Sequence, residues 1–171
     1  MLPCGDNVFA TALLALFLFA APAREAFAGD AEEKIRDTLQ AWTKDFNSGN
    51  ADAVCALFSP ELRYDFRGYP ERGYDDICKL LHRSLHDKSK RYTYSLDIRE
   101  IMVSGDLAVV RLVWRLTVAL PTGQTVSSTE PGMDVLRRQP DGAWKITRYI
   151  AYQVPERPAS GAAPSGAEEN R

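Results

Sequence analysis

An acidic and a basic residue near the C-terminal end of the chain are placed so that they could act together. Asp134 belongs to a predicted strand over residues 125–138, and Arg148 belongs to a predicted strand over residues 144–152. Residues 140–142 (Pro-Asp-Gly) form a turn signal between them, so the two segments should pair as a β-hairpin. Across that turn, Asp134 should face Arg148 or a near neighbour.

The Asp134–Arg148 pair allows two interpretations. Alternate residues of a strand share a face, and the residues of the last strand that should look inward are Trp144, Ile146, Arg148, Ile150 and Tyr152. An ion pair on that face would lie in a pocket, where it would be costly to desolvate and would orient a polar ligand. The alternative is a cross-strand pair at the rim of the sheet, worth roughly 0.2–1 kcal/mol. We favour the rim, because such networks are commonly structural.

A set of aromatic side chains falls on faces that should point toward the same interior. They are Trp42, Tyr64, Tyr94, Trp114 and Tyr152. With Arg148 as a polar partner, they would line a ligand-binding cavity for a small, mostly apolar molecule. The alternative is that these aromatics are simply core residues.

The histidines and cysteines do not form a metal-binding pattern. His82 and His86 lie one helical turn apart and could place two imidazoles on one metal ion, but no third ligand is evident. We therefore predict no metal site and no cofactor. Cys55 and Cys78 could form a disulfide in an oxidising compartment, worth about 3 kcal/mol. They could equally be small apolar residues on helix faces, and both interpretations stay open.

The two ends of the chain differ in composition from its middle. Residues 8–21 form an apolar run broken only by Thr11, and Ala-Phe-Ala at 26–28 offers a cleavage site. This pattern predicts a secretory signal peptide over residues 1–28, and hence a periplasmic or secreted protein that is free of the membrane after cleavage. An uncleaved anchor is the alternative, because the segment before the run has no Lys or Arg. Residues 155–171 are rich in Pro, Ala, Gly, Ser and Glu and are predicted to be a disordered tail.

Residues 29–154 should form one domain. The net charge is −2 with both signs interspersed, and no basic stripe suggests a nucleic-acid partner. Apolar periodicity predicts helices over residues 30–48, 51–58 and 74–86, and strands over residues 62–66, 92–101, 107–118, 125–138 and 144–152. This order is typical of an α+β fold in which N-terminal helices pack on a curved antiparallel sheet and enclose a pocket. Asp30 should cap the first helix, and Pro131-Gly132 should bend or bulge a strand.

Three short segments resemble one known family. Residues 46–58 (FNSGNADAVCALF) resemble the helix pair of the nuclear transport factor 2-like superfamily, which includes the SnoaL-like polyketide cyclases and ketosteroid isomerase. Residues 103–108 (VSGDLA) and 141–146 (DGAWKI) are similar to a turn and a hairpin of its SnoaL-like subgroup. The resemblance spans roughly residues 31–152. It implies a cone-shaped fold with a pocket between helices and concave sheet, often dimeric through the sheet, but no single activity.

The resemblance can be followed residue by residue to ketosteroid isomerase, which uses a tyrosine, a general base and a protonated aspartate. The tyrosine position falls on Trp42, which is not a phenol. The base position falls on Phe66, with Asp65 one residue earlier and so on the opposite face of a regular strand. The third position falls on Asp134, which is retained. The candidate catalytic residues are therefore Asp134 and, if a bulge turns it inward, Asp65.

The sequence thus favours an exported SnoaL-like domain of unassigned activity. We expect it to bind a small apolar molecule in its pocket and to form a homodimer. The alternative is an isomerase, cyclase or hydrolase of the ketosteroid isomerase-like kind that uses Asp134. Whether the protein is an enzyme is left open by the residues themselves.

Overall fold

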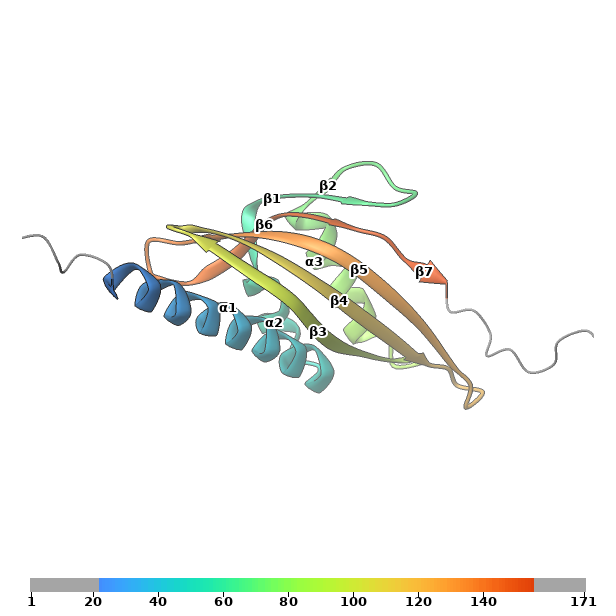
Figure 1. The fold of residues 1–171 in the computed structure, drawn as a ribbon. Coiled ribbons are helices and arrows are strands. Elements are labelled where there is room, and N and C mark those ends of the chain that lie inside the picture. The colour runs from blue at the N-terminus through green and yellow to red at the C-terminus, as the bar shows by residue number, and fades with distance from the viewer. Residues whose placement is uncertain (1–21, 156–171) are drawn as a thin grey trace, which may run out of the picture.

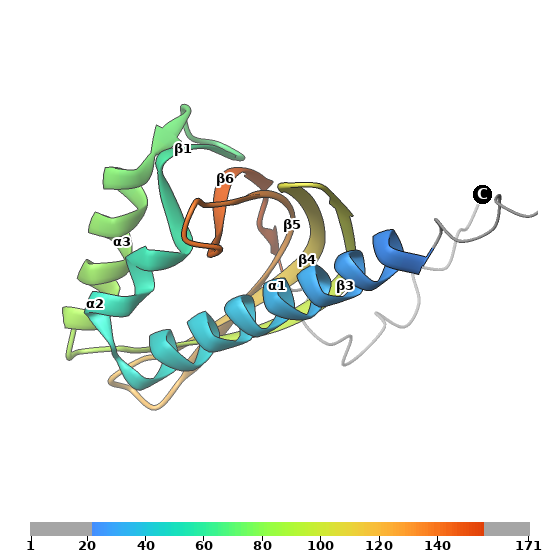
Figure 2. The same ribbon diagram turned by 90° about the vertical axis from the view of Figure 1, so that its left-hand side faces the viewer.

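A strongly curved, open β-sheet forms the centre of the computed structural model, which describes residues 22–155 (Figure 1). The helices lie along the sheet and around one end of it (Figure 2). The helical elements are α1 (Pro22–Ser48), α2 (Ala51–Val54), the 3-10 turn η1 (Cys55–Leu57) and α3 (Tyr74–His86). The strands are β1 (Phe58–Phe66), β2 (Arg72–Gly73), β3 (Arg91–Ser104), β4 (Leu107–Ala119), β5 (Thr125–Arg138), β6 (Trp144–Ala151) and β7 (Val154–Pro155).

The strands pair in the order β2-β1-β6-β5-β4-β3, and the short β7 pairs with β5. The pairs are antiparallel except for β1 and β6, which run parallel. The long strands β3, β4 and β5 form the curved wall, and the helices pack on its concave side. The predicted fold class, helices packed on a curved sheet, is confirmed.

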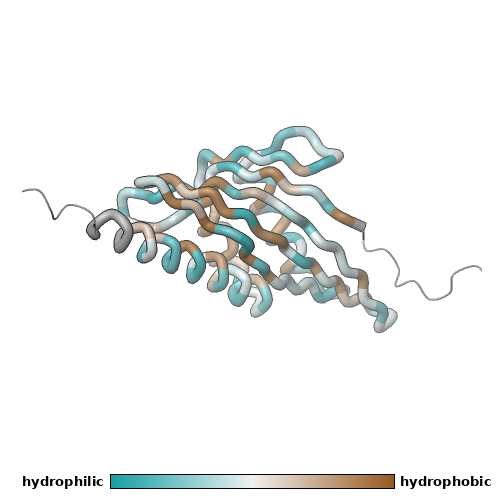
Figure 3. Tube along the Cα trace, viewed as in Figure 1, coloured by the Kyte–Doolittle hydropathy of each residue, from teal (hydrophilic) through white to brown (hydrophobic). Residues whose placement is uncertain are grey.

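Helix α1 is amphipathic and supplies much of the core. Its apolar residues recur every three or four positions, and the hydropathy alternates along α1 as the helix turns (Figure 3). Ile35, Leu39, Trp42 and Phe46 are between 0% and 7% exposed. They belong to one buried cluster with inward residues of β4 such as Val110. Burial of this stripe therefore holds α1 against the sheet.

The C-terminal end of α1 is fixed by a side-chain amide. Asn47 Nδ2 donates to the carbonyl of Tyr94 at 2.8 Å, and Asn47 Oδ1 accepts from the Tyr94 amide at 2.7 Å. Gly49 then takes a φ of +80°, which ends the helix in a conformation that other residues rarely adopt. The two bonds set the position of Tyr94 on β3, opposite the helix.

The N-terminal helix begins earlier than its sequence pattern predicts. Helix α1 starts at Pro22, so Asp30 lies inside it and pairs with Lys34 at 2.8 Å instead of capping the helix. The Ala-Phe-Ala segment at residues 26–28 falls within α1. Most of the predicted signal peptide and nearly all of the predicted tail lie outside the described residues. No helix among residues 22–155 is both long and apolar enough to span a membrane.

The irregularity in the pairing of β5 lies at a different place from the predicted bulge at Pro131 and Gly132, and its extra residue belongs to β6. The pairing of β5 with β4 runs without interruption past Pro131 and Gly132. The register with β6 instead shifts between Val135 and Leu136, so that Val135 faces Arg148 and Leu136 faces Ile146. Because a one-residue shift exchanges the faces of a strand, it decides which residues of β6 point inward.

Helix α3 is tied to the segment that precedes β1. Cys55 in η1 and Cys78 in α3 form a disulfide with a Cα–Cα distance of 5.5 Å. The structure thus decides between the two interpretations that the sequence left open. His82, one turn further along α3, places Nε2 3.5 Å from Cys55 Sγ. The bridge holds α3 beside η1, where it covers the open end of the sheet.

Removal of this disulfide should destabilise the fold. The double substitution Cys55→Ser and Cys78→Ser should lower the free energy of unfolding by about 3 kcal/mol, because the bridge no longer restricts the unfolded chain. Urea unfolding followed by tryptophan fluorescence measures this change. Dithiothreitol should shift the wild-type curve toward that of the variant and leave the variant unchanged. A wild-type curve that ignores the reductant would contradict the bridge.

Candidate functional site

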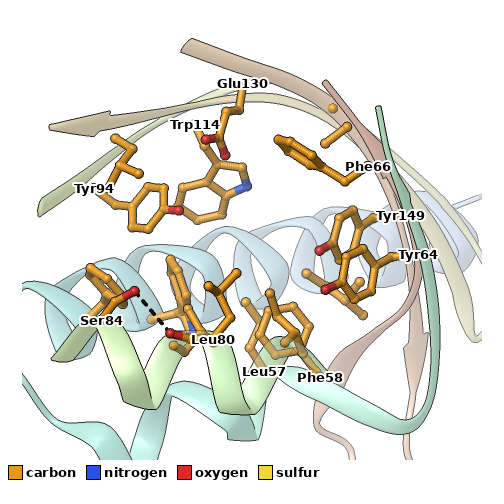
Figure 4. A pocket seen from close by; sticks show the side chains of 18 of the residues that line it. Leu57, Phe58, Tyr64, Phe66, Leu80, Ser84, Tyr94, Trp114, Glu130 and Tyr149 are labelled. Carbon is orange, nitrogen blue, oxygen red and sulfur yellow. Dashed lines mark hydrogen bonds between the residues drawn. The ribbon is translucent and has the colours of Figure 1, made fainter. Parts of the chain in front are cut away.

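A cavity of about 560 Å³ lies between α3, β1 and the concave face of the sheet (Figure 4). This volume is in the range typical of small-molecule sites. The residues that line it come from α1, η1, α3, the strands β1 to β6 and the loops beside them: Trp42, Phe46, Leu57, Phe58, Tyr64, Phe66, Tyr69, Arg72, Ile77, Leu80, Leu81, Arg83, Ser84, Asp87, Lys90, Tyr92, Tyr94, Leu112, Trp114, Leu116, Glu130, Gly132, Asp134, Ile146, Tyr149 and Ala151. Most of these side chains are apolar or aromatic, so the cavity favours an apolar body.

Packed aromatic rings form the floor of the cavity. Trp42 contacts Trp114 edge to face with a centroid distance of 5.0 Å and Tyr94 with a centroid distance of 5.6 Å. The Trp42 indole N–H donates to the carbonyl of Val54 at 2.7 Å. Since the indole has no other polar atom, Trp42 offers a ligand its ring and no hydrogen bond.

Two stacked tyrosines bring polar atoms to one end of the cavity. Tyr64 on β1 and Tyr149 on β6 are register partners of the parallel pair, with ring centroids 4.4 Å apart and planes inclined by 15°. Both rings turn their hydroxyls the same way (Figure 4). The Tyr64 hydroxyl is buried and has no hydrogen-bond partner. This hydroxyl lies at the cavity wall, where it can donate a hydrogen bond to an acceptor inside the cavity.

Asp134 joins the two tyrosines at this end. It is only 4% exposed and is the register partner of Tyr149 across β5 and β6. Burial raises the pKa of the Asp134 carboxyl to about 7, so the group is protonated through the mildly acidic range. Burial also raises the pKa of Tyr149, and the adjacent Tyr64 hydroxyl and the charge of Asp134 add to this effect. Asp134 and Tyr149 therefore favour their protonated forms, and these two groups and the Tyr64 hydroxyl can donate hydrogen bonds to an acceptor.

A second carboxyl group enters the cavity from the sheet. Glu130 lies on β5 opposite Trp114 of β4 and is half buried. Burial raises its pKa, while a hydrogen bond from the Ser128 hydroxyl, at 3.4 Å, opposes that shift. The charge of Glu130 contributes in turn to the raised pKa of Tyr94. The cavity thus holds two acids on one strand in different surroundings.

The mouth of the cavity carries the charged side chains that contact water. Arg72 lies over the ring of Tyr69, 4.2 Å from its centroid. Arg83 and Lys90, at the C-terminal end of α3 and beyond it, also line the opening. The loop and the helix end therefore present charged side chains around an apolar entrance, with Asp87 between the cations Arg83 and Lys90.

The structure brings some of the predicted site residues together and separates others. Those that line the cavity are Asp134, Trp42, Tyr64, Tyr94 and Trp114. Their roles in binding or catalysis stay predictions. Asp65, Arg148 and Tyr152 are exposed and do not line it.

The predicted ion pair between Asp134 and Arg148 is wrong. The Arg148 guanidinium donates to the carbonyls of Glu61 at 3.0 Å and Thr147 at 2.6 Å on the outer side of the sheet. The cause is the register shift at Val135 and Leu136, which turns Arg148, Ile150 and Tyr152 outward and Tyr149 inward. Asp65 faces outward because β1 alternates regularly at this point, with Tyr64 buried and Asp65 exposed.

Sequence reasoning missed Tyr149 and Glu130. No pattern in the sequence predicts the register shift that turns Tyr149 inward. Glu130 did carry a usable signal, since it lies an even number of residues before Asp134 and must share its face of a regular strand. Among residues 22–155, no group of three His, Cys, Asp or Glu side chains could hold a metal ion.

Comparison with known proteins points to one family. The model of the SnoaL-like domain matches residues 39–149. Among solved structures, an NTF2-like protein with a cystatin-like fold from Novosphingobium aromaticivorans is 22% identical, with a TM-score of 0.64 over 80% of this chain and 89% of that one. A putative dehydratase of the NTF2-like family from Streptomyces avermitilis is 19% identical, with a TM-score of 0.63 over 74% and 98%. A ketosteroid isomerase-like protein from Erwinia carotovora is 22% identical, with a TM-score of 0.58 over 71% and 95%. No curated protein sequence matches this chain.

The buried carboxyl of Asp134 should make stability depend on pH. Its pKa rises from 3.8 to about 7 on folding, so the folded state holds a proton that the unfolded state releases between these values. Its contribution to stability is therefore complete below pH 4 and falls by about 1.4 kcal/mol per pH unit up to about pH 7. Asp134→Asn cannot ionise and should be about as stable as the wild type at pH 4 but more stable at pH 8.

Urea unfolding at the two pH values tests this sign. Asp65→Asn, which removes an exposed carboxylate from β1, is the matched control and should show no pH-dependent gain. An Asp134→Asn variant that loses stability equally at both pH values would show that the carboxyl is ionised in the fold.

Proposed function

The chain belongs to the SnoaL-like domain family of the nuclear transport factor 2-like superfamily, and we propose that it binds one small, mostly apolar molecule through an acceptor oxygen. The observation that carries this proposal is the buried, unpartnered hydroxyl of Tyr64 at the end of an apolar cavity. A carbonyl or similar oxygen placed there would receive hydrogen bonds from Tyr64, Tyr149 and protonated Asp134.

The energetics favour a ligand at this end. A buried donor without a partner costs roughly 1–3 kcal/mol in the empty protein. An acceptor that satisfies the Tyr64 hydroxyl removes that cost, while the rings of Trp42, Trp114 and Phe58 cover the rest of the molecule. The aromatic walls thus supply most of the affinity, and the tyrosine pair supplies the orientation.

A proton-transfer enzyme is the second candidate function, and the neutral carboxyl of Asp134 among tyrosines favours it. Such a group can stabilise negative charge that develops on a carbonyl oxygen. The chemistry also needs a base beside the carbon that loses a proton. In this chain Phe66 occupies the base position suggested by ketosteroid isomerase, and Asp65 is exposed on the other face. Binding without turnover is therefore the function that we favour.

Removal of the Tyr64 hydroxyl should raise the stability of the protein but weaken its binding of a ketone ligand. Tyr64→Phe should raise the free energy of unfolding by about 1 kcal/mol, because it removes an unsatisfied buried group. The same variant should bind 4-acetylbiphenyl about tenfold more weakly than the wild type, yet bind biphenyl equally well. Tryptophan fluorescence titration gives both dissociation constants.

The control for this variant is Tyr152→Phe, which removes a hydroxyl outside the cavity and should change neither quantity. If Tyr64→Phe weakened the binding of both probes equally, the assigned orientation of the ligand would be contradicted. Incubation of 4-acetylbiphenyl with the wild type in D₂O decides between binding and turnover. Catalysed deuterium exchange into the acetyl methyl group would establish proton transfer and overturn the preference for a binding module.

We further propose that two copies of the chain associate through the outer face of the sheet. This face exposes apolar side chains on neighbouring strands, among them Met102, Met133 and Ile150, which are 48%, 48% and 64% exposed. Met133 and Ile150 are register partners. The same face carries charges of both signs, such as the Glu100–Arg111 ion pair at 3.0 Å. Contiguous apolar surface with mixed charge suits the self-complementary contact of a two-fold dimer.

Export is proposed together with the dimer. The apolar run over residues 8–21 is followed by Ala-Phe-Ala at 26–28, which is the pattern of a cleaved signal peptide. The Cys55–Cys78 disulfide is of a kind that persists in oxidising compartments.

Native mass spectrometry of the chain recovered from a bacterial periplasmic fraction tests both proposals. We expect a dimer of chains that begin at Gly29, and a monomer for the double substitution Met133→Lys and Ile150→Lys, because buried lysines oppose the contact. Val126→Lys changes an exposed apolar residue on the opposite face and should leave the dimer intact. A monomeric wild type would overturn the dimer, and a chain that retains residues 1–28 would overturn cleavage.

A further inference from the structure

The two carboxyl groups of the cavity lie on the same strand and the same face. Glu130 and Asp134 are four residues apart on β5, and the pairing with β4 is regular between them. A strand advances about 3.3 Å per residue, so their Cα atoms are about 13 Å apart. This distance is comparable to the length of a small apolar ligand. The cavity therefore has polar groups at two separated places and an apolar surface between them.

The surroundings of Glu130 differ from those of Asp134. The Glu130 carboxyl descends from the sheet into the cavity beside Trp114, well away from the Tyr64–Tyr149 stack (Figure 4). Ser128, only 7% exposed, donates its hydroxyl hydrogen to Glu130 Oε1 at 3.4 Å. Burial removes part of the hydration of the Glu130 carboxyl, and only one long hydrogen bond to Oε1 offsets this loss. The carboxyl therefore has acceptor capacity left for a bound group that donates a hydrogen bond.

The two ends of the cavity are chemically opposite. Tyr64, Tyr149 and the protonated carboxyl of Asp134 donate, whereas the Glu130 carboxyl already accepts from the Ser128 hydroxyl and acts as an acceptor. A ligand that satisfies both ends must accept at one end and donate at the other.

We propose that Glu130 is a second anchor for the ligand, and that the ligand is an elongated apolar molecule with an acceptor oxygen at the Tyr64 end and a hydroxyl or ammonium donor at the Glu130 end. This inference rests on the proposed binding function and narrows its ligand class. Glu130 sets specificity by contact with the far end of the ligand. The tyrosine pair orients the molecule so that this donor meets the carboxylate.

Matched probes on one rigid frame test the second anchor. The probes are 4-acetylbiphenyl, 4-acetyl-4′-hydroxybiphenyl and 4-acetyl-4′-aminomethylbiphenyl, which share the ketone and differ only at the far end. In the wild type, the hydroxyl and aminomethyl probes should each bind at least about tenfold more tightly than the ketone alone, because their donors meet a carboxylate. Fluorescence titration measures each dissociation constant.

Two substitutions separate the charge of Glu130 from its oxygen atoms. Glu130→Gln keeps an acceptor but no charge, so it should abolish the gain of the aminomethyl probe and retain much of that of the hydroxyl probe. Glu130→Leu should abolish both gains. The ketone-only probe should bind equally well to all three proteins, which confirms that the variants fold. Asp65→Asn removes an exposed carboxylate outside the cavity and should keep both gains, which controls for general attraction of a cation.

The outcomes are distinguishable from failure of the proposed function. Absence of both gains in the wild type, or gains of equal size in Glu130→Leu, would overturn the second anchor while the ketone-only probe still binds. If the ketone-only probe does not bind the wild type at all, the proposed function fails, and the ligand class fails with it.

Discussion

The register shift between β5 and β6 decides which side chains meet inside the cavity. Across it, Val135 faces Arg148 and Leu136 faces Ile146, so one residue of β6 is left without a direct partner. Beyond the shift the faces of β6 are exchanged, and Tyr149 turns toward Tyr64 and Asp134 while Arg148 turns to the outer side. Without it, a guanidinium would enter the cavity, and the carboxyl of Asp134 would be held ionised by that charge.

The end of the cavity formed by Tyr64, Tyr149 and Asp134 is neutral rather than charged, and this affects which ligands can bind there. The stacked rings of Tyr64 and Tyr149 and the buried Asp134 place three polar groups where water is largely excluded, and burial raises the pKa values of Tyr149 and Asp134. The fold tolerates this cost because the surrounding aromatic and aliphatic core is extensive. The unpartnered Tyr64 hydroxyl is thus available to donate a hydrogen bond to a ligand.

The helices hold the walls of the cavity in place. Burial of the apolar stripe of α1 and the Asn47–Tyr94 hydrogen bonds fix the floor of the cavity. The Cys55–Cys78 disulfide holds α3 over its side. Because α3 carries Leu80 and Ser84 along the opening, the same bridge that stabilises the fold also defines the shape of the entrance.

The sequence by itself determined the elements and much of the wall. Apolar periodicity located α3 and β5 at their observed bounds, and strict alternation placed Tyr94 and Trp114 on inward faces, because both patterns act over neighbouring residues. Tertiary structure alone decided that Tyr149 and not Arg148 meets Asp134, that Cys55 and Cys78 pair, and that β1 lies parallel to β6. These outcomes depend on register and on contacts between distant segments, where a shift of one residue reverses a face and leaves no local signal.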